Sequence, residues 1–244
     1  MLTLYKVLLS PVLLLQARWL RRTALRLPEA AGPRSGIEAG AAQSPPLRIL
    51  VVGDSSAAGV GVDEQSEALA QPVARLLAMR TGRPVAWQLV AKSGINTSEA
   101  LDLLSHAELG SADFLVTALG TNDVTSQRAP ARFLADYVRL VEDLRRRTGA
   151  LGLVVTGLPP LRILPAAPHP LRWYLGRYAA RLDRLLETWV GLDASARYVS
   201  LEWAAKPNEM ARDRFHPGHG QYRFWAELVA ERIVALLARE GERI

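Results

Sequence analysis

Near the end of this chain, the carboxylate of Asp213 comes three residues before the imidazole of His216. At this spacing the aspartate can accept a hydrogen bond from Nδ1 of the histidine, which sets the tautomer and stabilises the imidazolium form. A histidine held in this way can remove the proton of a serine hydroxyl, which is a poor nucleophile without a base. Because Asp213 equally suits a helix or turn cap, the pair predicts acyl transfer only together with a suitably placed serine.

Ser55 is the candidate for that serine. It follows Gly53-Asp54 at the end of the first strongly apolar run of the chain, residues 47–52. Its neighbour Ser56 has the same local chemistry, and residues of these types also commonly cap a turn after a strand. Local reasoning therefore leaves the choice between the two hydroxyls open.

Two further positions could stabilise the negative oxygen that forms when a serine attacks an ester. Gly94 follows the apolar run 85–90, and a glycine there can bring its backbone N–H close to a ligand. Asn122 follows the apolar run 114–119, and its side-chain amide can donate alongside the N–H of Ser55. A tight turn at Gly94 and a turn-forming Asn-Asp pair at Asn122 are the structural alternatives.

The elements that must position these residues alternate between apolar runs and amphipathic stretches. This alternation predicts an α/β fold in three layers, with helices on both faces of a parallel sheet. In a sheet of flavodoxin-like order, 2-1-3-4-5, the ligand crevice opens between strands one and three, which Ser55 and Asn122 would flank. The predicted strands are 47–52, 85–90, 114–119, 151–158 and 197–201, and the predicted helices are 67–80, 98–106, 131–147, 171–190 and 221–239.

Four segments, in this order, resemble the sequence blocks of the SGNH (GDSL) hydrolase superfamily. They are Gly53-Asp54-Ser55, Gly94, Gly120-Thr121-Asn122-Asp123 and Asp213-x-x-His216. The resemblance implies the SGNH hydrolase fold, with a five-stranded parallel sheet, and an esterase, lipase or thioesterase that needs no metal and no cofactor. It also implies a triad of Ser55, His216 and Asp213, and an oxyanion hole made by the Ser55 N–H, the Gly94 N–H and the Asn122 side chain.

The resemblance favours Ser55 over Ser56, which stands where the family name has leucine. We therefore expect a serine hydrolase that cleaves carboxylic esters through an acyl-enzyme on Ser55, with lipid or acyl esters favoured as substrates. A carbohydrate O-acetyl esterase or an acyltransferase of the same fold would need the same residues. A non-catalytic binding module is less favoured, because the chain keeps both Ser55 and His216. The proline-rich stretch 159–173 fits either an acyl-binding wall or a rigid connection.

The basic charge of the chain is concentrated at its start. The formal net charge is +6, and residues 1–35 contain six basic residues and one acidic residue, so the other 209 residues carry only +1. A nearly neutral domain argues against binding to nucleic acid. Cysteine is absent, which excludes disulfides and any cysteine ligand or nucleophile.

The first 27 residues form an apolar and basic leader, residues 28–46 a predicted linker, and residues 47–244 the hydrolase domain. The apolar part, residues 2–15, is shorter than the roughly 20 residues that cross a bilayer. A membrane-associating helix with Trp19 and arginines at the headgroups is the favoured interpretation. A signal peptide and a helix packed on the domain are the alternatives. We expect a membrane-associated protein on the cytoplasmic side, or a periplasmic or secreted one if the leader is a signal sequence.

Overall fold

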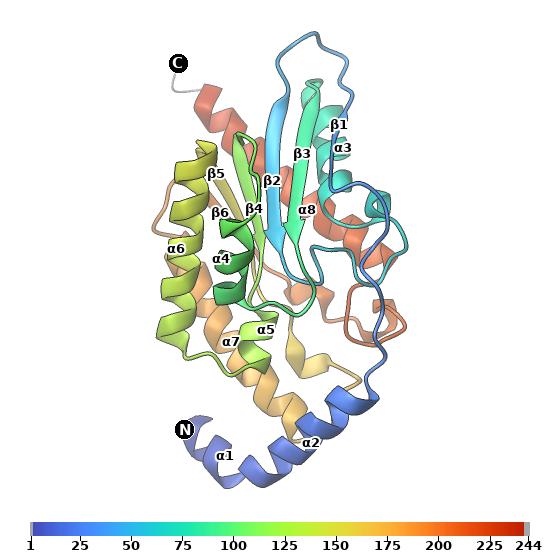
Figure 1. Cartoon of the computed structure of the whole chain (residues 1–244), viewed down its shortest axis with the longest axis vertical. Helices are drawn as coiled ribbons and strands as arrows, with labels where there is room; N and C mark the ends of the chain where they lie inside the picture. Colours follow the sequence, from blue (N-terminus) through green and yellow to red (C-terminus); the bar gives the residue numbers. More distant parts are fainter. Residues whose placement is uncertain (1, 242–244) are drawn as a thin grey trace.

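A six-stranded sheet forms the middle layer of the computed structural model, which describes residues 2–241 (Figure 1). The strand order is β1-β3-β2-β4-β5-β6. Strands β2 to β6 are parallel in the predicted order 2-1-3-4-5, and β1 pairs with β3 in the antiparallel sense at the edge. The strands are β1 Ser35–Glu38, β2 Leu47–Gly53, β3 Val85–Ala91, β4 Phe114–Ala118, β5 Gly152–Thr156 and β6 Ala196–Val199.

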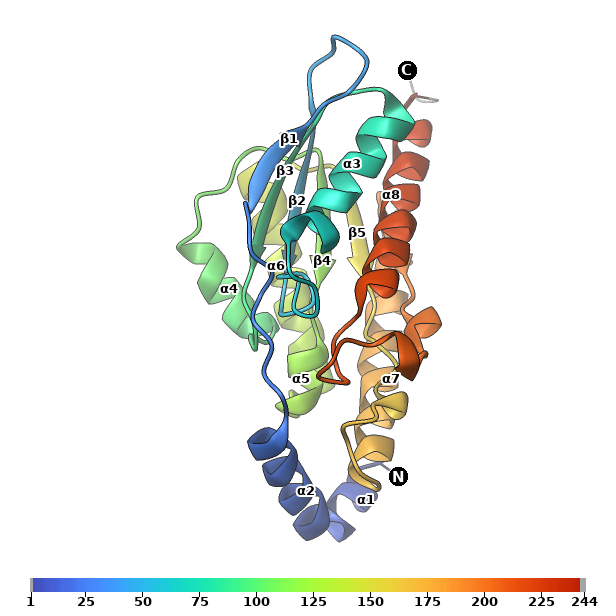
Figure 2. The same cartoon turned by 90° about the vertical axis from the view of Figure 1, so that its right-hand side faces the viewer.

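Helices cover both faces of the sheet, which confirms the predicted three layers (Figures 1 and 2). Successive residues of β2 contribute to opposite cores: Ile49 and Val51 pack with α3 and α8, while Leu50 and Val52 pack with α4, α6 and α7. A strand buried on both faces has no polar alternation, which explains the apolar run that Arg48 alone interrupts in β2. The helices are α1 Leu2–Leu8, α2 Ser10–Thr23, α3 Ala70–Thr81, α4 Thr97–Ser105, α5 Thr121–Thr125, α6 Pro130–Thr148, α7 Leu171–Val190 and α8 His219–Gly241.

The predicted elements of the domain are present, with ends shifted by a few residues. Helix α3 begins at Ala70 because Gln65–Glu67 forms a separate 3-10 turn before it. Helix α6 ends before Gly149, as its sequence predicts, and this glycine adopts a left-handed conformation with φ +75°. The five-residue helix α5 lies between β4 and α6, where no element was predicted.

The segment predicted as a linker, residues 28–46, is partly ordered against the domain. Strand β1 lies within it and pairs with β3 from Ser35 opposite Gln88 to Glu38 opposite Val85. The side chains of β1 are mostly exposed, so the strand has no apolar pattern by which its sequence could reveal it. Part of the predicted linker therefore forms an ordered strand, because backbone pairing at an open sheet edge needs no apolar side chains.

The leader forms the two short helices α1 and α2 at the start of α7. Leu13 is buried there, and the ring of Tyr5 meets that of Trp173 edge to face, with centroids 5.2 Å apart. The side chain of Gln16 donates to the carbonyl of His169 over 2.7 Å and accepts from the N–H of Leu171 over 3.0 Å. Within residues 2–241 no helix combines the length and hydropathy needed to cross a bilayer. Membrane association stays a prediction.

Candidate active site

The structure brings Ser55, His216 and Asp213 together at the carboxyl end of β2. The hydroxyl oxygen of Ser55 lies 2.8 Å from Nε2 of His216, although 161 residues separate them in sequence. Nδ1 of the same histidine lies 2.5 Å from Oδ2 of Asp213. The hydrogen bonds therefore run from carboxylate through imidazole to hydroxyl, as the residue types and spacing predict.

The turn that carries the histidine also holds Asp213 in its ionised form. Oδ1 of Asp213 accepts the N–H groups of Phe215 and His216, each over 3.0 Å. Burial raises the pKa of Asp213, but the hydrogen bonds from His216 and Phe215 outweigh it, and the pKa lies below its usual value. An ionised carboxylate in this position keeps the proton of the imidazole on Nδ1, so that Nε2 faces Ser55 as an acceptor.

Close packing sets the position of the turn that carries the candidate nucleophile Ser55, residues 54–60, here called the nucleophile turn. A Cβ atom at Gly53 would lie 2.4 Å from Cβ of Ala57, so only glycine fits before the turn. The N–H of Val60 donates to the carbonyl of Ser55 over 3.0 Å. The buried hydroxyl of Tyr222, from α8, lies 2.8 Å from the carbonyl oxygen of Ser56 and 2.9 Å from that of Val60. Sequence reasoning missed Tyr222, because nothing in the pattern of α8 distinguishes this tyrosine from a core residue.

Ser56 occupies a different position from Ser55. His216 contacts the hydroxyl of Ser55, whereas the backbone N–H of Ser56 donates to Oδ1 of Asp54 over 3.1 Å. The contact from Ser56 to Asp54 is a turn cap, the structural role that the sequence also allowed for the Asp-Ser-Ser segment. One segment thus supplies both a cap, from Asp54, and a hydroxyl that faces the histidine, from Ser55.

The two candidate oxyanion donors lie on neighbouring loops, but their amides are arranged differently. Asn122 is in the first turn of α5, and its Nδ2 donates to the carbonyl of Ile95 over 2.9 Å and to Oδ2 of Asp54 over 3.3 Å. Gly94 sits in the exposed turn after β3 with φ +84° and open space beside its Cα atom. Asp54 thus joins Asn122 to the residue next to Ser55, and no hydrogen bond within residues 2–241 joins Asn122 or Gly94 to Ser55 itself.

The region of residues 51–224 matches the model of the GDSL-like Lipase/Acylhydrolase family. The chain belongs to this family. A curated relative, the GDSL-like esterase Rv1075c of Mycobacterium tuberculosis (strain ATCC 25618 / H37Rv), is 27% identical over 202 residues. The match covers 75% of this chain but 60% of the relative, so the chain spans only part of that protein's length. The resemblance to SGNH (GDSL) hydrolases is confirmed.

Solved structures share the fold of this GDSL-like hydrolase. The lipase Lip_vut3 from a goat rumen metagenome superposes with a TM-score of 0.60 at 19% identity, over 75% of this chain and 95% of that one. The protein TesA gives 0.59 at 23% identity, over 78% and 99%. A family 2 carbohydrate esterase with a carbohydrate-binding domain, from Corynascus thermopiles, gives 0.58 at 17% identity, over 81% and 68%. These likenesses establish the three-layer fold.

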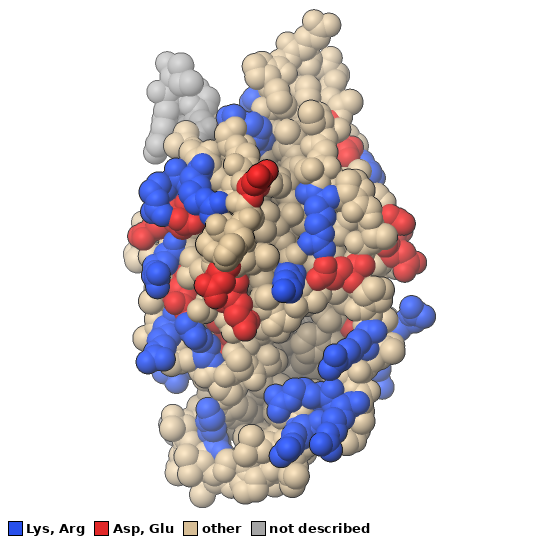
Figure 3. All heavy atoms as spheres, in the orientation of Figure 1, with Lys and Arg blue, Asp and Glu red and all other residues tan. Residues whose placement is uncertain are grey.

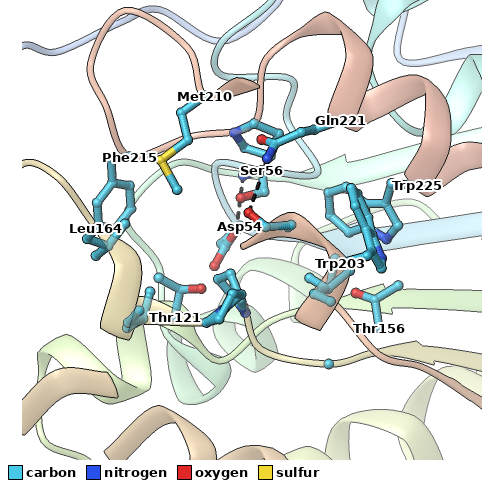
Figure 4. Close-up of a pocket in the computed structure, with 18 of the residues that line it drawn as sticks. Asp54, Ser56, Thr121, Thr156, Leu164, Trp203, Met210, Phe215, Gln221 and Trp225 are labelled. Atoms are coloured by element: carbon cyan, nitrogen blue, oxygen red, sulfur yellow. Dashed lines mark hydrogen bonds between the residues drawn. The ribbon is translucent and has the colours of Figure 1, made fainter. Parts of the chain in front are cut away.

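Beside the nucleophile turn, the GDSL-like hydrolase has a small, mostly apolar pocket of about 60 Å³ (Figure 4). Asp54 and Ser56 lie between its two sides. Leu164, Met210 and Phe215 line one side, and Trp203 and Trp225 the other. Several of these residues come from loops with no helical or strand pattern, so their convergence was not predictable from the sequence.

No group of three or more histidine and acidic side chains in the described part of the hydrolase could hold a metal ion. Asp54, next to Ser55, is an unusual ionisable group. Burial raises the pKa of Asp54 from 3.8 to about 6, although the hydrogen bond from Ser56 and the charge of His216 lower it. At neutral pH the chain therefore holds a second buried carboxylate next to Ser55, and the side-chain amide of Asn122 donates to it.

The raised pKa of Asp54 makes the stability of the hydrolase depend on pH. Between about pH 4 and 6 the folded state binds this proton more tightly than the unfolded chain, so the free energy of unfolding falls as the pH rises. A change from 3.8 to about 6 corresponds to about 3 kcal/mol. Asp54→Asn should remove this component and leave a shallower decline in this window, measured by urea unfolding at a series of pH values. Parallel profiles for the two proteins would contradict the assignment.

Proposed function

We propose that this chain is a serine hydrolase that cleaves carboxylic esters through an acyl-enzyme on Ser55. The observation that supports it most directly is the 2.8 Å contact between the Ser55 hydroxyl and Nε2 of a histidine whose Nδ1 is bound to Asp213. A hydroxyl, a base and an orienting carboxylate in this arrangement are what acyl transfer requires. Membership of the GDSL-like lipase/acylhydrolase family supports the same reaction.

In the first half of the proposed reaction, the oxygen of Ser55 attacks the ester carbonyl carbon while its proton moves to Nε2 of His216. Asp213 stabilises the imidazolium without taking its proton. The tetrahedral intermediate collapses when the imidazolium donates this proton to the leaving alcohol, and the acyl group stays on Ser55. In the second half, His216 takes a proton from water, the hydroxide attacks the acyl carbon, and the carboxylic acid leaves as Ser55 regains its proton.

The negative oxygen of the intermediate needs donors. We assign them to the N–H groups of Ser55 and Gly94 and to Nδ2 of Asn122. One hydrogen of this amide now points at the carbonyl of Ile95 and the other at Asp54. The contact to Asp54 is the longer of the two at 3.3 Å, so this hydrogen is the one that would turn to the oxyanion. Each donor of this kind contributes roughly a hundred- to thousandfold in turnover.

The pocket beside the nucleophile turn supports an acyl group as the part of the substrate that binds there. Its sides are leucine, methionine, phenylalanine and tryptophan side chains, which suit a hydrocarbon better than a sugar. At about 60 Å³ it suits a short chain. Pro159, Pro160 and Leu161 of the proline-rich stretch line the same pocket, which favours the acyl-binding wall over a mere connection. The fold shared with carbohydrate esterases leaves their reaction as the second candidate.

A fluorophosphonate probe and a series of p-nitrophenyl esters of increasing acyl length test this function. The probe should label Ser55, as mapped by peptide mass spectrometry, and His216→Ala should abolish the labelling because the serine loses its base. Turnover should be highest for short acyl chains, and Leu164→Trp, which narrows the pocket, should shift the preference toward acetate. No labelling of a folded protein would favour a binding module, and faster hydrolysis of acetylated sugars than of p-nitrophenyl esters would favour the carbohydrate esterase.

A further inference from the structure

Helices α1 and α2 have two apolar sides, and only one of them is used within the domain. On the inner side Leu13 is buried, and Leu9 and Leu20 pack against the same core. On the outer side of α2, Val12, Leu15 and Trp19 recur at helical spacing and are exposed, with Leu15 69% exposed. The outer side of α1 adds the exposed residues Leu4, Val7 and Leu8. A contiguous apolar surface that stays exposed and is bordered by polar residues normally marks a site of interaction with a membrane or another protein.

Cationic side chains surround this exposed apolar side. Residues 1–27 contain five basic residues and no acidic one. In the part of the chain that the structure describes, none of the five lies within ion-pair distance of a carboxylate. Figure 3 shows lysine and arginine side chains gathered over the end of the molecule where α2 lies. The five are Lys6, Arg18, Arg21, Arg22 and Arg26.

A groove between α1 and α7 extends the same surface. Leu2 and Tyr5 line it from α1, and Arg177, Arg181 and Arg184 line it from α7 at helical spacing. These three arginines are exposed, and no lining residue of the groove is acidic. The groove therefore places three further positive charges next to exposed aliphatic side chains, which is the combination that a phosphate headgroup on an acyl chain would occupy.

This surface lies at the catalytic end of the sheet. The arrows of the parallel strands point toward the end of the molecule where α1 and α2 lie (Figure 1). The contacts of Gln16 to His169 and Leu171 join α2 to the loop that leads from the pocket into α7. Leu13 of α2 and Leu164 of the pocket wall belong to the same core.

We propose that the outer sides of α1 and α2, with the arginine groove on α7, form a docking surface for a bilayer containing anionic phospholipids. The aliphatic and Trp19 side chains enter the boundary between headgroups and acyl chains, and the arginines bind the phosphates. A second copy of the chain fits less well, because a two-fold contact would place the same arginines against each other. Nucleic acid would leave the apolar side chains in water. The surface contains no triad residue, so this proposal and the proposed esterase can fail separately.

Flotation of the full-length protein with vesicles tests the docking surface. The protein should bind vesicles of phosphatidylcholine mixed with phosphatidylglycerol, and bind pure phosphatidylcholine at least about tenfold more weakly, with a further loss as salt is added. Leu15→Glu and the pair Arg18→Glu/Arg22→Glu should each weaken binding to the mixed vesicles about tenfold or more. Hydrolysis of a soluble p-nitrophenyl ester should stay at the wild-type rate in these variants, which shows that the domain is folded.

Matched variants at the opposite end of the molecule serve as controls. Leu192 is 83% exposed after the end of α7, and Arg80 is exposed in the last turn of α3. Leu192→Glu matches Leu15→Glu in charge and hydropathy, and Arg80→Glu makes half the charge change of the arginine pair; both should leave vesicle binding unchanged. Equal binding to both kinds of vesicle, or an equal loss in these controls, would overturn the proposal. The proposal would also be overturned if the protein does not bind vesicles but forms a dimer in light scattering, and Leu15→Glu dissociates this dimer. The surface would then be a contact between two copies of the chain.

Discussion

Replacement of Ser55 by alanine is expected to lower kcat/KM for ester hydrolysis by at least about a thousandfold. The change removes the hydroxyl oxygen of the nucleophile turn that Nε2 of His216 contacts, so no acyl-enzyme can form. The turn itself should survive, because its backbone bonds and its contacts to Tyr222 do not use the hydroxyl of Ser55. Steady-state kinetics with a p-nitrophenyl ester, beside thermal unfolding by circular dichroism, measure both quantities.

Ser56→Ala is the matched control for this experiment. The side chain lost has the same size and chemistry and is adjacent in sequence, but of the two serine hydroxyls His216 contacts that of Ser55. The contact from the Ser56 N–H to Asp54 is retained because it belongs to the backbone. We therefore expect turnover within a few fold of wild type, as for a residue that lines the pocket without reacting. Loss of activity in Ser56→Ala, with Ser55→Ala active, would move the nucleophile by one residue.

Asp213→Asn should lower kcat by about ten thousandfold while the fold persists. The Asn side chain keeps an oxygen that can accept the N–H groups of Phe215 and His216, as Oδ1 does now. Its amide would then face Nδ1 of His216 as a donor, so the ring would carry its proton on Nε2 and could not accept one from the serine. Kinetics and the ¹⁵N chemical shifts of the ring nitrogens measure the loss and its cause.

Asp213→Ala distinguishes the two roles of the carboxylate. This variant also loses the acceptor for the two backbone N–H groups, so it should unfold at a lower temperature than Asp213→Asn while being similarly inactive. An Asp213→Asn enzyme that keeps wild-type turnover, or one whose Nδ1 still carries the proton, would show that the aspartate does not set the tautomer.

The sequence predicted the parallel part of the fold because each of its elements has a local pattern. Strand β2 is an apolar run interrupted only by Arg48, and Gly149 ends α6 where a glycine after a basic turn should. Strand β1 lacked any such pattern, since its exposed side chains carry no information and its pairing with β3 uses the backbone. Within the predicted linker, the contact of Glu29 with the N–H of Ser93 joins residues 64 apart, which local reasoning cannot find.

The candidate site was predictable where spacing implies geometry. The three-residue spacing from Asp213 to His216 fits a single turn, and the ends of adjacent parallel strands bring Ser55 and Asn122 to one edge. The sequence could not show that Asn122 donates to Asp54, since this depends on the rotation of one side chain. Nor could it place Trp203 and Met210 in the pocket, because they lie on loops whose course only the packed domain defines.

The separation of Ser55 and His216 has a consequence for the protein while it is being made. His216 comes 161 residues after Ser55 in the sequence. Tyr222, whose hydroxyl donates to the nucleophile turn, comes 166 residues after Ser56. A ribosome that adds about 5 to 20 residues per second takes roughly 10 to 30 s to pass from one to the other. Throughout that interval the nascent sheet carries an ordinary hydroxyl without a base. On the proposed mechanism, the growing chain is thus unable to cleave an ester until α8 has been translated and has docked.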